Sequence, residues 1–177
     1  MTTKAISEGY TTITSCITCK DAKKEMEFLK QAFGATERFQ MACPETKRVI
    51  HAEMQVGSAR IMLSDKNPDM GCKSAADLGG SPVGFYLYVQ DVDAAFAKAT
   101  TAGAKTKMPL ADMFWGDRTG TVTCPEGYDW TVASHVKDLT PEQQKEAGAK
   151  FMAEMKKKAS NDPTKPMPMK METSGKR

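Results

Sequence analysis

Apolar and polar residues are spaced as in β-strands in some stretches of this chain and as in α-helices in others. The same order of strand-like and helix-like stretches occurs twice. The first occurrence begins with a β-branched stretch at 11–19, which predicts a strand, and continues with apolar residues at helical spacing after Asp21. The second begins with an alternating stretch at 83–89 and continues with helical spacing after Asp91. Further strand-like stretches follow each helical stretch. The pattern therefore predicts two β-α-β-β-β modules of similar construction.

Both predicted helices carry residues that begin and end helices. Asp21 and Asp91 can accept the free backbone N–H groups of a first turn, and Gly34 and Gly103 follow the last helical residues. The strands predicted after the two helices cover residues 36–43, 49–56, 59–64, 106–110, 119–124 and 128–135. A later helix is predicted at the sequence Thr-Pro-Glu-Gln that starts at Thr140, because it combines a capping hydroxyl, a proline and a capping-box glutamine.

The parts of the chain differ in composition, which predicts a folded domain with a tail at each end. Gly and Pro interrupt the pattern between the modules, and Pro, Lys, Met and Thr dominate the last residues. We expect a flexible N-terminus at 1–9, one domain at 10–138, a helix at 139–159 and a disordered tail at 160–177. Within the domain we expect module one at 11–65, a linker at 66–80 and module two at 81–136.

Composition and charge argue against some classes of function, such as binding to nucleic acid or to a membrane. With 40% hydrophobic and 27% charged residues in a length of 177, the chain suits one compact domain. The net charge is +3 and the two signs are interspersed, so we expect no nucleic-acid partner. No stretch approaches the roughly 18 apolar residues of a membrane span, and the first residues lack a signal-peptide core. We therefore expect a cytoplasmic protein with no membrane partner.

The chain has five cysteines, and this odd number argues against a disulfide framework. Cys16 and Cys19 form a C-x-x-C sequence, which occurs in redox and zinc sites. They lie in a predicted strand, where residues three apart point to opposite faces of a sheet. We therefore expect the two side chains to pack separately.

Strand alternation assigns the side chains to two faces, one apolar and one mixed. In the strand at 49–56 the even-numbered residues from Ile50 to Val56 form the apolar face, and Val49 joins the mixed face. In module two the apolar face comprises Phe85, Leu87, Val89, Trp130 and Val132, and the mixed face comprises Gly84, Tyr86, Tyr88, Asp129, Thr131, Ala133 and His135. The mixed face is either the wall of a ligand pocket or an ordinary solvent-facing surface.

Seven short motifs are spread over residues 11–140. They are FLKQAFGA at 28–35, HAE at 51–53, IMLSD at 61–65, LYVQDVDA at 87–94, MPLAD at 108–112, FWGDR at 114–118 and WTVASH at 130–135. As a set they resemble the vicinal oxygen chelate superfamily of glyoxalase I, bleomycin-resistance proteins and extradiol dioxygenases, and most of all its branch named after a phosphonate-operon protein. The resemblance implies an α+β fold in which two βαβββ modules form curled mixed sheets around a shared cavity, in a homodimer.

The resemblance also implies four metal-ligand positions, on the first and last strand of each module. In this chain they are Thr14, Met62, Gly84 and Thr131. Hydroxyl, thioether and hydrogen do not replace imidazole or carboxylate donors, so we expect no metal and no other cofactor there. Glyoxalase I activity is not expected either. The sequence CPEGY at 124–128 also departs from the Asp-Pro-Phe-Gly-His that is usual in the superfamily.

His51 and Glu53 are the candidate catalytic residues, because they point the same way from one predicted strand. They could act as an acid–base pair in which Glu53 raises the basicity of His51. They could also supply two metal ligands, with His135 as a remote third. A structural hydrogen-bonded pair at a module or dimer seam fits the sequence equally well.

Trp115 and Arg118 are candidates for ligand contact. Indole offers a flat apolar surface, and guanidinium offers a fixed fork for carboxylate or phosphate oxygens. Alternatively, Asp117 and Arg118 only hold their own loop in place.

Three functions remain open, and we expect the first. It is metal-free binding of a small aromatic or anionic molecule in the cavity between the modules. The second is a metal-dependent lyase, isomerase or dioxygenase that uses His51 and Glu53, and the third is a dimeric scaffold with a closed cavity. The ligand-binding residues expected for the first are Met62, Tyr86, Tyr88, Trp115, Arg118 and Thr131.

Overall fold

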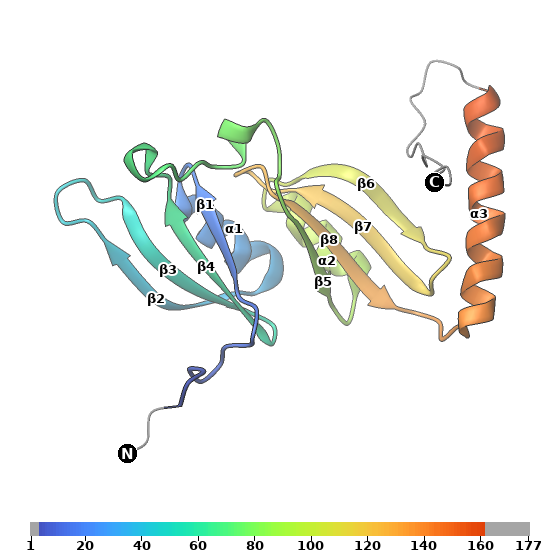
Figure 1. Ribbon diagram of the computed structural model, residues 1–177, viewed down its shortest axis with the longest axis horizontal. Helices are drawn as coiled ribbons and strands as arrows, with labels where there is room; N and C mark the ends of the chain where they lie inside the picture. The colour runs from blue at the N-terminus through green and yellow to red at the C-terminus, as the bar shows by residue number, and fades with distance from the viewer. Residues whose placement is uncertain (1–3, 162–177) are drawn as a thin grey trace, which may run out of the picture. The chain divides into compact units, whose positions relative to one another are not determined.

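The computed structural model describes residues 4–161, which belong to two units (Figure 1). The first unit comprises the chain up to Ala111 together with Arg118–His135, and the second comprises Asp112–Asp117 and the chain from Val136. The described residues have an α+β fold with two four-stranded mixed sheets and three α-helices. The predicted fold class is therefore confirmed. Residues 1–3 of the predicted N-terminal tail and 162–177 of the predicted C-terminal tail lie outside the described residues.

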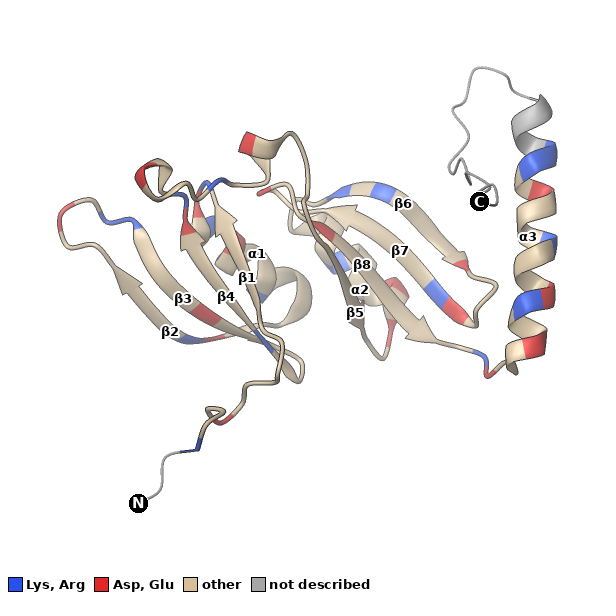
Figure 2. Cartoon of the chain, in the orientation of Figure 1, with Lys and Arg blue, Asp and Glu red and all other residues tan. Residues whose placement is uncertain are grey.

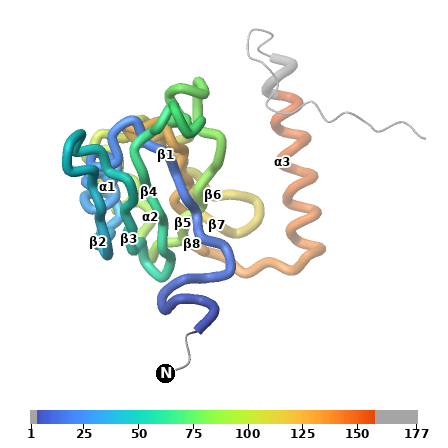
Figure 3. The backbone as a smooth tube through the Cα atoms, turned by 60° about the vertical axis from the view of Figure 1, so that its left-hand side comes forward, coloured from blue at the N-terminus to red at the C-terminus, as the bar shows by residue number. Residues whose placement is uncertain are grey.

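Module one forms the first sheet. Its elements are β1 (Ser15–Cys19), α1 (Ala22–Phe33), β2 (Thr36–Ala42), β3 (Val49–Val56) and β4 (Ala59–Asp65). The strand order is β1-β4-β3-β2, with β1 parallel to β4, so that β1 lies beside a strand far from it in sequence (Figure 3). The predicted caps of α1 are both present. The Asp21 carboxylate accepts the Lys24 backbone N–H at 3.2 Å, and Gly34 ends the helix in the left-handed region at φ 65°.

Module two forms the second sheet in the same order. Its elements are β5 (Gly84–Tyr88), α2 (Val92–Thr101), β6 (Lys105–Asp112), β7 (Asp117–Thr123) and β8 (Asp129–His135). The strand order is β5-β8-β7-β6, with β5 parallel to β8, which repeats the order of the first sheet. The repeat inferred from the sequence is therefore confirmed. Between the modules lie two short 3₁₀ turns, Pro68–Met70 and Ala76–Leu78.

The side chains divide between the sheet faces as expected, with one exception. Cys19 is buried and Cys16 is exposed, so the two cysteines do point to opposite faces. The exception lies at the start of β3, where Val49 is 1% exposed and Ile50 is 52% exposed, the reverse of the prediction. The cause is a shift in the β2–β3 register, which pairs Met41 with His51 but the next residue with Val49. This bulge leaves Ile50 without a partner and reverses the alternation.

The two modules share one hydrophobic core. The Trp130 ring stacks on Phe85 with centroids 4.4 Å apart and lies 5.2 Å from Phe33 of α1. The Tyr128 hydroxyl donates to the backbone oxygen of Thr18, in the other module, at 2.7 Å. Side chains of both modules therefore fill this part of the space between them, and helices α1 and α2 pack against each other.

The C-terminal helix α3 (Pro141–Asn161) lies in the second unit and starts where the sequence predicts. The backbone N–H of Thr140 donates to the Gln143 side chain at 2.9 Å, and the Gln143 N–H donates to the Thr140 hydroxyl at 3.2 Å, which completes the capping box. Phe151 of α3 packs on Phe114 with ring centroids 5.4 Å apart. Among residues 4–161, no helix is both long and apolar enough to cross a membrane.

Candidate functional site

The second sheet brings three of the predicted ligand-binding residues together. Tyr86 and Tyr88 project from β5 with their rings 5.2 Å apart and are 47% and 62% exposed. Thr131 of β8 is the direct neighbour of Tyr86 in the register, and its hydroxyl is 2.9 Å from the hydroxyl of Thr121 on β7. These four residues, Tyr86, Tyr88, Thr121 and Thr131, form what we call the tyrosine face. It is opposite the face that packs on α2.

Arg118 does not lie on the tyrosine face. It shares a side of β7 with Gly120, where an added Cβ would lie 2.6 Å from the Phe96 ring of α2. The Arg118 guanidinium donates to both carboxylate oxygens of Asp93 on α2, at 2.9 and 2.8 Å, and this contact holds the pKa of Asp93 below its ordinary value. The sequence reasoning treated Arg118 as a loop residue. The strand begins at Asp117, and alternation then directs Arg118 toward the helix.

The other two predicted ligand residues lie apart from the tyrosine face as well. Met62 belongs to β4 of the first sheet, where it pairs with Cys16 on one side and Glu53 on the other. Trp115 belongs to the second unit, and its indole N–H donates to Asp117 at 3.1 Å. The contribution of these side chains to ligand binding stays a prediction.

The first sheet carries a network of polar side chains centred on Glu53. His51 Nε2 lies 3.3 Å from Glu53 Oε1, and Arg60 Nη1 donates to Glu53 Oε2 at 3.2 Å. The Arg60 guanidinium in turn lies over the Tyr10 ring, 4.5 Å from its centroid. We call His51, Glu53, Arg60 and Tyr10 the Glu53 network. All but Tyr10 are half-buried side chains of β3 and β4.

The electrostatics of the Glu53 network favour an ionised carboxylate. The hydrogen bond from the Tyr10 phenol, followed by contacts with His51 and Arg60, holds the pKa of Glu53 below its ordinary value. Burial and the nearby Glu53 raise the pKa of Tyr10. The ionised Glu53 therefore neutralises Arg60 and orients the His51 ring. Sequence reasoning found His51 and Glu53 but missed Tyr10, which lies before the first strand.

Neither predicted set of metal ligands fits a divalent cation. The positions implied by the superfamily carry only a thioether, a glycine hydrogen and two hydroxyls, and an added Cβ at Gly84 would meet nothing within 4 Å. Around Glu53, one carboxylate oxygen faces His51 and the other faces the Arg60 guanidinium, which disfavours a second cation there. His135 lies on the other sheet and does not complete the set. No group of three or more His, Cys, Asp or Glu side chains suited to a metal occurs within residues 4–161.

A buried polar cluster lies at the module seam, which we define by Glu25, Cys124, Tyr128 and Trp130. The Glu25 side chain on α1 is fully buried, and its Oε2 accepts the Cys124 thiol at 3.1 Å. The pKa of Glu25 is raised to about 7, chiefly by burial and also by the nearby Glu126, against the opposing effect of the Cys124 thiol and the Trp130 indole. Among the described residues, Glu25 Oε1 has no hydrogen-bond partner.

The sequence contained a signal for Glu25 that the reasoning passed over. Ala22, Glu25, Met26 and Leu29 follow the spacing of one helix face, and all four are buried. The stretch CPEGY at 124–128, which departs from the superfamily pattern, supplies the other side of the seam. The unusual residues in this turn therefore join the modules.

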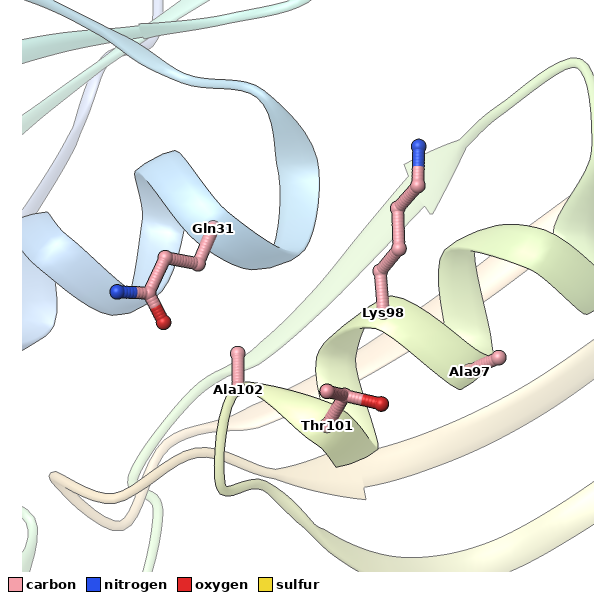
Figure 4. A pocket seen from close by; sticks show the side chains of 5 residues that line it. All are labelled: Gln31, Ala97, Lys98, Thr101 and Ala102. Carbon is pink, nitrogen blue, oxygen red and sulfur yellow. The ribbon is translucent and has the colours of Figure 1, made fainter.

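Three hollows among the described residues are lined by residues other than the predicted ligand residues. One of about 270 Å³ lies between α1 and α2, where Figure 4 shows Gln31 of one helix and Lys98 of the other. A second, of about 360 Å³, lies beside the start of β3 and includes Cys43 and Cys72. The third, of about 600 Å³, lies at the N-terminal end of α1.

Comparisons with known proteins agree with the fold and with the sequence motifs. Residues 10–132 match the family described as the Glyoxalase/Bleomycin resistance protein/Dioxygenase superfamily. The chain is 38% identical over 126 residues to the uncharacterized protein Mb0911c of Mycobacterium bovis, which covers 70% of this chain and 82% of that protein. It is 29% identical to the solved gene product At5g48480 of Arabidopsis thaliana, with a TM-score of 0.57 over 70% of this chain and 98% of that one.

A further likeness concerns the fold. The fold resembles that of a putative 3-demethylubiquinone-9 3-methyltransferase, PhnB protein, from Bacillus cereus, at 17% identity and a TM-score of 0.55 over 70% of this chain and 99% of that one. At this level of identity the likeness concerns the fold alone. From the family match and the curated relative together, the chain belongs to the glyoxalase, bleomycin resistance protein and dioxygenase superfamily.

Proposed function

We propose that this protein binds a small aromatic molecule against the tyrosine face of its second sheet. The observation that carries the proposal is the pair of neighbouring, solvent-exposed rings of Tyr86 and Tyr88 on rigid strand β5. Exposed aromatic side chains side by side offer apolar area to a flat ligand without the loss of much conformational freedom. The paired hydroxyls of Thr121 and Thr131 supply polar groups beside the rings.

The same geometry favours an aromatic ligand over a purely anionic one at this face. Arg118, the cation expected to bind an anionic group, pairs with Asp93 on the other side of β7. Lys107 of the same sheet pairs with Asp129. Both cations are therefore already neutralised by carboxylates, and aromatic surface is what remains to recognise a ligand.

The test uses 8-anilinonaphthalene-1-sulfonate, a fluorescent aromatic anion, as the probe. The double substitution Tyr86→Ala with Tyr88→Ala should weaken binding by a factor of ~5 to 150, because two ring contacts at ~0.5 to 1.5 kcal/mol each sum to ~1 to 3 kcal/mol. The control is the double substitution Ile13→Ala with Leu78→Ala, since both residues are exposed apolar side chains that belong neither to the tyrosine face nor to the proposed dimer surface. Equal loss of binding in both variants would refute the proposal.

A second candidate function is a metal-free acid–base reaction at the Glu53 network. The distance of 3.3 Å between His51 and Glu53 favours it, because a carboxylate at that range orients an imidazole for proton transfer. The substitution His51→Gln should then abolish proton exchange of activated C–H groups in a panel of α-hydroxy ketones, followed by NMR in heavy water. No exchange above that of buffer by the parent protein would remove this candidate.

We also propose that two copies of the chain form a homodimer through the first sheet. Phe39, Met41 and Ile50, on β2 and the start of β3, are each about half exposed. Light scattering coupled to size-exclusion chromatography should give twice the chain mass. The variant Phe39→Glu should return it to the monomer mass, and a monomeric parent protein would contradict the proposal.

A further inference from the structure

The largest of the three hollows has a lining rich in basic side chains. It holds about 600 Å³, which is in the range of small-molecule sites, and residues of both modules line it. The cations come from two segments, the start of α1 and the β2–β3 turn, where Figure 2 shows Lys and Arg in blue. They are Lys20, Lys23, Lys24, Lys47 and Arg48, and we call this site the basic hollow.

The carboxylates in the basic hollow are already bound to backbone groups. Glu126 accepts the N–H groups of Lys20 and Asp21 at 2.6 and 3.0 Å. Asp65 accepts the N–H groups of Ala22 and Val49, both at 2.7 Å. Asp21 accepts the first-turn N–H of α1 as its cap. The N–H groups of Ala22 and Lys24 at this helix end are thus already bound within the protein, so a ligand here would be recognised chiefly by the side-chain cations.

Those cations form few ion pairs with carboxylates. Within the part of the chain that the structure describes, Lys20, Lys23, Lys47 and Arg48 form no ion pair. Lys24 reaches Asp21 only at 3.8 Å with both side chains exposed, which contributes little. Several lysines elsewhere on the protein do form close ion pairs with Glu or Asp, namely Lys30, Lys66, Lys107 and Lys150.

We propose that the basic hollow binds a small molecule that carries a diphosphate group. The five cations of the basic hollow outnumber its three carboxylates, so a positive charge remains there that a polyanion can neutralise as it binds. A diphosphate has enough negative charge for several cations at once, and Arg48 presents a fork that matches its oxygens. The cations come from two separate segments of the chain, which suits two adjacent phosphates better than one carboxylate.

This site is independent of the tyrosine face. It uses the start of α1 and the β2–β3 turn of module one, whereas the tyrosine face lies on β5, β7 and β8. Loss of diphosphate binding would therefore leave the binding of the aromatic probe unchanged, and the two proposals fail separately.

The experiment is titration calorimetry with inorganic pyrophosphate at low salt, without added metal. The double variant Lys23→Gln with Arg48→Gln should bind pyrophosphate at least tenfold more weakly than the parent. The control Lys98→Gln with Lys105→Gln removes the same charge from exposed positions outside the hollow and should change the affinity less than twofold. Both pairs lie on the surface, and far-UV circular dichroism verifies that each variant is folded.

Two results would overturn the proposal. One is the absence of pyrophosphate binding to the parent protein. The other is an equal loss of affinity in both double variants, which would show attraction to the overall charge of the protein in place of a site.

Discussion

Glu25 at the module seam gives a quantitative prediction about stability and pH. Its pKa is raised from 4.5 to about 7, chiefly because the side chain is fully buried. Between these two pH values the folded protein holds a proton that the unfolded chain has released. The free energy of unfolding therefore falls as pH rises through this window, and it is lower above pH 7 than below pH 4.5.

The expected change in stability follows from the raised pKa of Glu25. Because each pKa unit corresponds to about 1.36 kcal/mol, the rise from 4.5 to about 7 lowers the free energy of unfolding by about 2 to 3 kcal/mol between pH 5 and pH 8. Glu25→Gln keeps the size of the side chain and removes its titration. The stability of this variant relative to the parent should therefore rise by that amount from pH 5 to pH 8.

The assay is urea denaturation of parent and variant at several pH values in this range. Other groups titrate in the same window, and the difference between parent and variant cancels their contributions. Glu27→Gln is the control, because Glu27 is exposed on the same helix and should show no such trend. A stability difference between parent and Glu25→Gln that is constant with pH would refute the assignment of a raised pKa to this carboxyl.

Four other substitutions test the faces of the second sheet. Trp130→Ala removes a core ring that is 3% exposed and should lower the free energy of unfolding by ~3 to 5 kcal/mol; an unchanged melting temperature would show that the faces are assigned backwards. Arg118→Ala breaks an exposed ion pair with Asp93 and should cost only ~0 to 1 kcal/mol in denaturation while leaving binding of the aromatic probe intact. Gly120→Ala forces a Cβ against the Phe96 ring and should cost ~1 to 3 kcal/mol, whereas Gly84→Ala, with open space around it, should be near neutral in the same thermal scan.

Local rules predicted most of the fold from the sequence. The caps of α1 and the capping box at Thr140 depend on residues within one turn of each other, and all are present in the structure. The order of strands follows from the repeated pattern and from the resemblance together. Alternation failed at Ile50, because the bulge that reverses the start of β3 depends on how β2 pairs with it.

The candidate site was less predictable because it depends on contacts across the fold. Tyr86, Tyr88 and Thr131 were placed together correctly, since their strands follow simple alternation. Arg118 was not, because its side depends on where β7 begins and on Asp93, 25 residues earlier in the chain. The basic hollow joins segments that only the tertiary structure brings together, and no spacing in the sequence indicates it.

The proposed ligand face is tested most directly by two-dimensional amide NMR during titration with 8-anilinonaphthalene-1-sulfonate. The account predicts that the largest shifts occur at the backbone amides of Tyr86, Tyr88 and Thr131, with little change around Glu53. Largest shifts at Gln31 and Lys98, in the hollow between α1 and α2, or at the Glu53 network would contradict it.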